Sequence, residues 1–157
     1  LPAGADPHVR MQLLLDLARL SPPPEAAARC DEVLEQALQL EFAGVAMRAR
    51  LLGADARRQA GDTRAAADAM QELVAQLPQL QPADMTLAEA WWLAAQAFDA
   101  AGAGELALIT MGQGAHWVRQ VALPQVPPAF RDSFLQRNPD NRALLAAADR
   151  RLSAGGR

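Results

Sequence analysis

The sequence predicts an all-α fold, an antiparallel helical-hairpin solenoid of about eight helices with a C-terminal capping pair. Apolar residues make up 51% of the chain and aromatic residues only 4%, because alanine, the best helix former, is so frequent. Strand-length runs of β-branched residues are missing. One segment also recurs at a spacing of 41 residues, which is typical of stacked repeats. The matched residues are Gly61 with Gly102, Ala66 with Ala107, and Met70 with Met111.

The first hairpin is expected over about residues 6–40. Its first helix runs to Leu20 and is ended by Ser21 and three prolines. Apolar residues recur at helical spacing along this helix and are expected to face the core: Val9, Leu13, Leu17 and Leu20. The second helix, about 24–40, is expected to bury Ala26, Cys30, Val33 and Ala37, with Leu38 as a further candidate. A turn is expected near 41–44.

The second hairpin is expected over about residues 45–77. Gly61 separates its two helices, since glycine readily takes the left-handed conformation that ends a helix. Asp62 or Thr63 can cap the helix that follows. That helix presents Ala66, Met70, Leu73, Val74 and Leu77 before Pro78.

The third hairpin is expected over about residues 86–122. Thr86 and Glu89 form a capping-box pattern at its start. The first helix then carries a full apolar stripe, and the second repeats its spacing. The two stripes are Leu87, Trp91, Ala94, Phe98 and Ala101, and Ala107, Met111, Gly114, Val118 and Val121. Gly112 and Gly114 are interpreted as close helix packing against Trp91 or Trp117.

Residues 126–152 are expected to form the terminal cap. Phe130, Phe134 and Leu135 are too apolar to lie exposed on a short helix. Asn138 before Pro139 is typical of a capped helix start. A repeat array needs such a cap to cover its last hairpin. We therefore expect this segment to pack back on the third hairpin and the whole chain, 1–157, to form one domain.

Composition and charge restrict the class of partner. The net charge is −3 with a pI near 5.3, which argues against binding nucleic acid or an anionic membrane surface. No apolar run approaches the roughly 20 residues that span a bilayer, and the amino end lacks the pattern of a signal peptide. We expect a cytoplasmic location. The single cysteine, Cys30, leaves no intrachain disulfide to form.

The sequence predicts no enzyme, no metal site and no cofactor. His8 and His116 lie in different hairpins, and no set of His, Cys and carboxylate residues has the spacing of a metal site. Cys30 is expected to act as a small buried hydrophobe. The pairs Arg57–Arg58 and Arg150–Arg151 are interpreted as solvated faces, with forked binding of a phosphate or carboxylate as the alternative.

Six residues of the third hairpin carry a resemblance to a known family. Trp91, Ala95, Phe98, Gly102, Ala107 and Met111 have the spacing of the tetratricopeptide repeat. Residues 47–78 resemble a second, degenerate copy. The tail from Val126 to Leu145 is similar to the closing segment of large bacterial regulators that carry an ATPase module. The resemblance implies a sensory or scaffolding end of a signalling or transcriptional regulator.

The resemblance also implies a binding face, because the first helix of each such repeat lines a concave groove. Carried over position by position, that face comprises Glu89, Trp92, Gln96 and Asp99, and Arg48, Leu51, Asp55 and Arg58. Exposed Trp and Arg are typical binding anchors. The alternative is that Trp92 packs against the preceding hairpin. The expected partner is a protein, a peptide or another domain of the parent chain, with self-association left open. The alternative function is the sensing of a small-molecule inducer.

Overall fold

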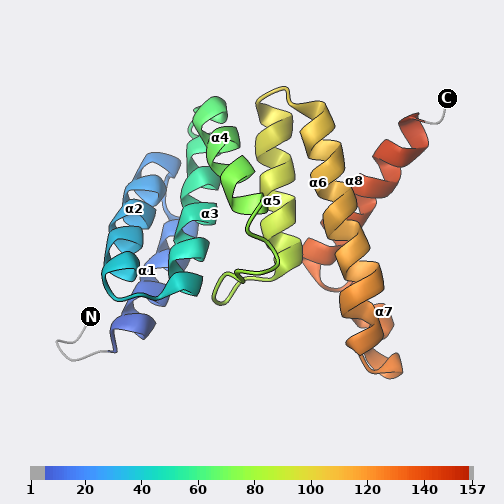
Figure 1. The fold of residues 1–157 in the computed structure, drawn as a ribbon, viewed down its shortest axis with the longest axis horizontal. Coiled ribbons are helices and arrows are strands. Elements are labelled where there is room, and N and C mark those ends of the chain that lie inside the picture. The colour runs from blue at the N-terminus through green and yellow to red at the C-terminus, as the bar shows by residue number, and fades with distance from the viewer. Residues whose placement is uncertain (1–5, 156–157) are drawn as a thin grey trace. The chain divides into compact units, whose positions relative to one another are not determined.

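The computed structural model describes residues 6–155, and every regular element in that range is helical (Figure 1). It contains eight α-helices and three shorter helical turns, with no strand in the described range. The predicted all-α class is therefore confirmed. The chain divides into two compact units, one up to Met85 and one from Thr86 onward.

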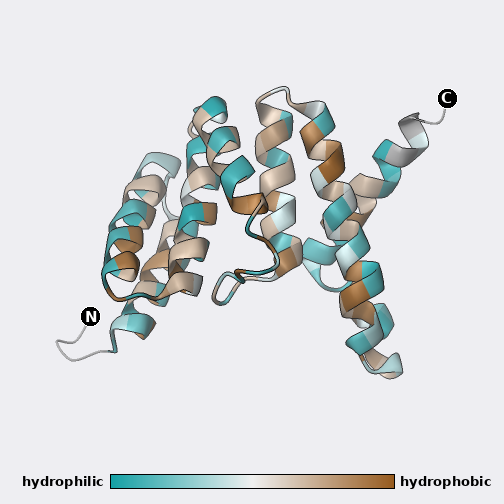
Figure 2. Ribbon diagram, viewed as in Figure 1, coloured by the Kyte–Doolittle hydropathy of each residue, from teal (hydrophilic) through white to brown (hydrophobic). Residues whose placement is uncertain are grey.

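Unit 1 consists of two helical hairpins in which the third helix is central. Its helices are α1 (Pro7–Leu20), α2 (Pro23–Gln39), α3 (Ala43–Gln59) and α4 (Thr63–Val74). Helix α3 packs against all three others, most extensively against α2. Small residues make this close approach possible: a Cβ added at Gly53 would lie only 3.2 Å from the Cβ of Cys30. Hydrophilic and hydrophobic residues alternate along these helices (Figure 2), as amphipathic packing requires.

Unit 2 begins with α5 (Leu87–Ala100) and α6 (Gly104–His116), which form an antiparallel hairpin. A π-helical turn, η1 (Trp117–Ala122), continues α6, and two 3₁₀ turns follow, η2 (Leu123–Gln125) and η3 (Pro128–Phe130). The unit ends with α7 (Arg131–Gln136) and α8 (Pro139–Gly155). Helix α8 packs against both α5 and α6, which confirms the prediction for the last helix of the tail, whereas α7 packs on α8.

The three helix ends at Glu41, Gly61 and Gly102 share one turn geometry. All three residues have positive φ, at 59°, 95° and 77°. In each turn the next residue donates its N–H to the carbonyl five residues earlier, the bond that closes a Schellman motif. The two glycines fulfil the sequence prediction. In the turn expected near 41–44 it is Glu41 that takes the left-handed conformation, and Gly44 lies within α3.

Close packing and capping in unit 2 follow the sequence prediction. A Cβ added at Gly114 would lie 2.9 Å from the Cβ of Trp91 and 2.8 Å from Cδ2 of Leu144, so α6 approaches both α5 and α8 at this glycine. Trp91 is buried, with its ring 5.7 Å from that of Trp117. The Oδ1 atom of Asn138 accepts the N–H groups of residues 140 and 141, each at 3.0 Å, and so caps α8.

The predicted core face of α1 is wrong. Val9, Leu13, Leu17 and Leu20 are 51%, 43%, 49% and 85% exposed. The helix instead buries Met11, Gln12, Leu15 and Ala18. Helix α1 has apolar residues on more than one face, and contacts with α2 and α3 select the face that also places Gln12 beside Arg48.

Two apolar residues of the tail region also differ from expectation. Phe130 is 62% exposed at the end of a single 3₁₀ turn, although we expected it to be covered. Val121, expected on the buried stripe, is exposed too. It lies in the π-helical turn, whose wider winding breaks the α-helical spacing on which the prediction rested. Phe134 and Leu135 are half-buried.

Candidate functional site

Arg48, predicted to line an open groove, is buried in unit 1 at 2% exposure. Its Nη1 donates to Oε1 of Gln12 at 2.6 Å, and its Nη2 donates to the carboxylate of Asp16. Two buried donors nearby, Nε of Arg48 and Nε2 of Gln12, have no acceptor within the described part of the chain. The guanidinium therefore joins α3 to α1. The prediction that Arg48 lies on an open face is wrong.

Asp55 and Arg58, predicted for the same groove, are engaged with each other. Asp55 is buried and accepts from Nε of Arg58 at 2.8 Å and from Nε2 of Gln59 at 2.7 Å. Arg58 remains partly exposed. Leu51, placed on the same face, is fully buried. The α3 residues that were predicted to line a groove are thus mostly buried in the core or engaged in ion pairs.

The other two arginines of α3 also bind carboxylates of neighbouring helices. Arg57 donates to both oxygens of Asp31 on α2, each at 2.7 Å, and Arg50 pairs with Glu72 on α4 at 3.2 Å. The pair Arg57–Arg58 was interpreted as a solvated face or an anion site, but each member has a carboxylate partner in unit 1. Helix α3 therefore reaches α1, α2 and α4 through one arginine each.

The predicted face of α5 keeps three partly exposed residues. Glu89 is buried, and its backbone N–H donates to Oγ1 of Thr86 at 3.0 Å, as the capping pattern predicts. Asp99 accepts both bonds from Nη2 of Arg151 on α8. Trp92 and Gln96 are half-buried, one turn apart on α5. These two and the ion-paired Asp99 are the members of the predicted set that α5 presents in part to solvent.

Cys30 is a buried thiol without an activating base. Its pKa is raised from 9.0 to about 11, mainly by burial and also by the neighbouring carboxylate of Asp31, while Arg57 and Arg48 oppose the shift. A thiolate is the reactive form of cysteine, so this environment disfavours nucleophilic chemistry. Cys30 instead fills the contact between α2 and Gly53 of α3.

The exposed apolar row on α1 is the candidate interaction surface. We call Val9, Leu13, Leu17 and Leu20 the α1 stripe. At a rise of about 1.5 Å per residue the stripe extends about 16 Å along the helix. Contiguous exposed hydrophobic side chains of this kind mark interaction sites more often than single ones do. The sequence found these residues by their spacing and assigned them to the core, so it identified the row and misplaced it.

The chain around the α1 stripe is acidic. Residues 6–41 contain seven carboxylates and three arginines, a net charge of −4, and the pairs of Asp16 with Arg48 and of Asp31 with Arg57 reduce this to −2. Two of the carboxylates, Glu32 and Glu35, lie exposed on α2 and pair with no arginine in the described range. This end of unit 1 would therefore attract a cationic partner and repel an anionic one.

Within residues 6–155 no group of three or more His, Cys, Asp or Glu side chains is arranged to hold a metal ion. None of the described helices is both long and apolar enough to cross a membrane. Comparison with protein-family models, with curated proteins and with solved structures gives no significant match to this chain.

Proposed function

We propose that this chain is a non-catalytic interaction module, a tetratricopeptide-like solenoid within a cytoplasmic bacterial signalling or transcriptional regulator. Two local correspondences support a repeat. The turns at Gly61 and Gly102 have the same geometry, and the matched residues Ala66, Ala107, Met70 and Met111 are all buried. The resemblance of Trp91 to Met111 to the repeat family supports its type, and the resemblance of the tail supports the class of parent protein.

The observation that carries the proposal is the α1 stripe. A row of four large apolar side chains at spacings of four, four and three residues matches the ridge that a second helix packs against. The partner is accordingly an amphipathic helix of a protein, whose apolar face covers the stripe. Residues 6–41 keep a net charge of −2 after Arg48 and Arg57 have neutralised two of their carboxylates, so that helix bears basic residues beside its apolar face. The same charge disfavours an anionic lipid surface as the partner.

Two synthetic helical peptides test the proposal. Both carry the same leucine stripe, one with arginine and the other with glutamate on its polar face, and binding is measured by fluorescence anisotropy. The arginine peptide is expected to bind, and Leu13→Asp and Leu17→Asp are each expected to weaken it about tenfold or more, since each places a charge in the contact. The glutamate peptide is expected to bind more weakly, with the difference shrinking at high salt.

Leu38→Asp is the matched control, because Leu38 is an exposed leucine of α2 outside the stripe. It should leave the affinity unchanged. Equal affinities for wild type and the stripe variants, or no binding of either peptide, would remove the α1 stripe as the interaction surface. Sedimentation of the chain alone tests the remaining alternative, self-association. Concentration-dependent dimers that Leu13→Asp abolishes would mean that a second copy of the chain covers the α1 stripe.

The alternative function, a small-molecule sensor, was predicted around Trp92 and Arg58. Arg58 is paired with Asp55 in unit 1, so its guanidinium is already engaged. A different place, a cleft in unit 2, favours this second function.

A further inference from the structure

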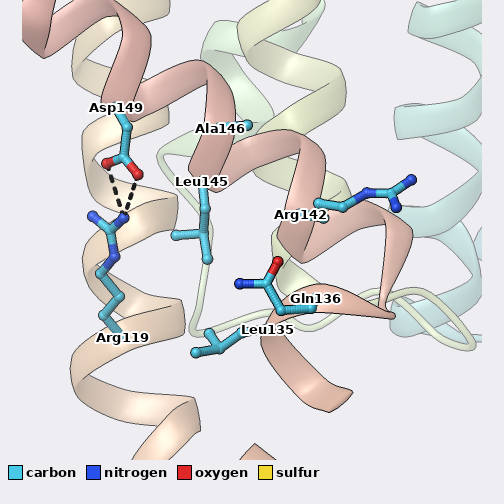
Figure 3. A pocket seen from close by; sticks show the side chains of 7 residues that line it. All are labelled: Arg119, Leu135, Gln136, Arg142, Leu145, Ala146 and Asp149. Atoms are coloured by element: carbon cyan, nitrogen blue, oxygen red, sulfur yellow. Dashed lines mark hydrogen bonds and ion pairs between the residues drawn. The ribbon is translucent and has the colours of Figure 1, made fainter. Parts of the chain in front are cut away.

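Unit 2 contains a cleft of about 300 Å³ that none of the predicted site residues lines. It lies between η1, α7 and α8, and Figure 3 shows its lining. Arg119 and Asp149 face each other at one end. Leu135, Leu145 and Gln136 lie in the middle, and Arg142 extends from α8 at the other end. Leu135 and Leu145 are half-buried, so they offer an apolar wall that solvent still reaches.

The charges at one end of the cleft are already balanced. Nη2 of Arg119 donates to both carboxylate oxygens of Asp149, at 2.8 and 2.9 Å (Figure 3). Arg119 is carried by the π-helical turn η1, and such turns are uncommon in helical proteins and frequent at functional sites. The pair fixes this end of the cleft and neutralises one arginine.

Arg142 is the unbalanced charge of the cleft. Its side chain is exposed and forms no hydrogen bond or ion pair within residues 6–155, and the side-chain amide of Gln136 is likewise without a partner in that range. In Figure 3 the guanidinium of Arg142 is turned away from the Arg119–Asp149 pair. No bond holds it there, so this long side chain is free to turn toward a ligand.

We infer that this cleft binds a small monocarboxylic acid with an apolar body. The carboxylate accepts forked hydrogen bonds from Arg142 and a further one from the amide of Gln136. The apolar body lies against Leu135 and Leu145. One positive charge remains after the Arg119–Asp149 pair, which matches one negative charge on the ligand. At about 30 Å³ for each water-sized group, the volume corresponds to roughly ten such groups, the size of a small organic acid. This goes beyond the proposed protein interaction, which uses a different surface.

Titration of the full chain with 3-phenylpropionate, an acid of that size, tests the inference. Binding is followed by ¹H–¹⁵N NMR and is expected to saturate in roughly the millimolar range, as small ligands of this size do. Shift changes should concentrate in η1, α7 and the part of α8 from Arg142 to Asp149. Saturating acid should also raise the melting temperature, because it binds the folded state alone.

Arg142→Gln is expected to weaken binding about tenfold, since it removes the charge and leaves no structural bond broken. Arg150→Gln is the matched control: Arg150 is an exposed α8 arginine outside the cleft, and its loss should leave the affinity unchanged. The uncharged 3-phenylpropionamide should bind markedly more weakly than the acid.

Three results would overturn the inference: no saturable shifts, shifts mapped away from the cleft, or unchanged affinity in Arg142→Gln. Inorganic phosphate binding as tightly as the acid would also overturn it, because the apolar wall would then contribute nothing. Leu13→Asp on α1 should leave acid binding unchanged, so failure of the protein interaction and failure of this site remain distinguishable.

Discussion

At the scale of single residues, the cost of burying Arg48 is offset by two side chains of α1. Asp16 supplies the charge and Gln12 supplies a second acceptor. The two lie one turn apart on α1, so they face α3 together. The carboxylate of Asp16 is itself 59% exposed, so only the guanidinium half of the pair is removed from water. This asymmetry makes the consequences of removing each partner unequal.

We predict that Asp16→Ala destabilises the fold more than Arg48→Met. Removing Asp16 leaves a buried cation with Gln12 alone, which should lower the free energy of unfolding by about 2–4 kcal/mol. Arg48→Met keeps an apolar stem in the core and leaves Asp16 to water, so its main cost is the donor lost by Oε1 of buried Gln12, about 1–2 kcal/mol. Urea unfolding of both variants measures the difference. The exposed pair Arg50–Glu72 is the control, and Glu72→Ala should cost less than about 1 kcal/mol. A larger loss of stability for Arg48→Met than for Asp16→Ala would show that Asp16 does not offset the burial of Arg48.

The thiol of Cys30 predicts a stability loss at alkaline pH. Its pKa is about 11 in the folded chain against an ordinary 9.0, so the folded state holds this proton more tightly than the unfolded state. The stabilisation is complete below about pH 9 and is lost as the pH rises through 11, by up to about 2–3 kcal/mol. The chain has no lysine or tyrosine, so few other groups titrate in that window.

Urea unfolding under reducing conditions between pH 8 and 11 measures this loss. Cys30→Ala removes the titrating group and should flatten the pH dependence, although it lowers stability at every pH by opening a small cavity. Parallel pH profiles for wild type and Cys30→Ala would assign the alkaline loss to another group.

At the scale of elements, the chain repeats one way of ending a helix. The turns at Glu41, Gly61 and Gly102 use the same left-handed residue and the same backbone bonds. Two of the three positions are glycine, which adopts this conformation without a steric cost. The third is a glutamate, whose Cβ makes the same conformation unfavourable.

We therefore predict opposite effects of substitution at two equivalent turns. Glu41→Gly should stabilise unit 1 by about 0.5–1 kcal/mol, because it relieves the strain of a positive φ. Gly61→Ala should cost about 1 kcal/mol, since nothing surrounds that site to clash and only the backbone conformation opposes the methyl group. Thermal unfolding followed by circular dichroism measures both. Destabilisation by Glu41→Gly would mean that the glutamate side chain stabilises the turn by a contact of its own.

At the scale of the whole molecule, the C-terminal segment covers the apolar face of the α5–α6 hairpin in unit 2. Helix α8 covers both α5 and α6, and Leu144 fills the space beside Gly114. Two exposed ion pairs, Arg119–Asp149 and Arg151–Asp99, join it to the hairpin and its extension. Exposed pairs contribute little by themselves, so the attachment depends mainly on apolar packing.

Truncation after Leu123 is expected to lower the melting temperature and to give a dimeric or aggregating product. The reason is that loss of α8 exposes the apolar face of α5 and α6 to water. Size-exclusion chromatography with light scattering, together with thermal unfolding, measures both effects. Arg119→Gln in the full chain is the control and should change the stability little. A monomeric truncated chain with unchanged melting would make residues 124–157 a detachable segment and a better candidate than the α1 stripe for contacting a partner.

The sequence alone determined the features that depend on short-range geometry. Gly61 and Gly102 take positive φ, Thr86 and Asn138 cap helices, and the all-helical class follows from alanine content and spacing. Each of these depends on φ, ψ and hydrogen bonds within a few residues, which local sequence specifies directly. The close helix packing at Gly114 was also predicted, because a glycine within an apolar stripe lets a neighbouring helix approach.

Only the tertiary structure decided which helix faces are buried and which charged side chains form ion pairs. Helical spacing defines an apolar row but does not say whether a neighbour covers it, so the α1 stripe was identified and placed in the core. Arg48 was assigned to a groove by its position in the resembled repeat, and no local pattern connects it to its partner Asp16, which lies 32 residues away. The cleft beside Arg142 joins η1, α7 and α8 and exists only once they are packed. Burial and charge pairing depend on contacts between segments that are distant in the sequence. Local sequence patterns do not specify those contacts.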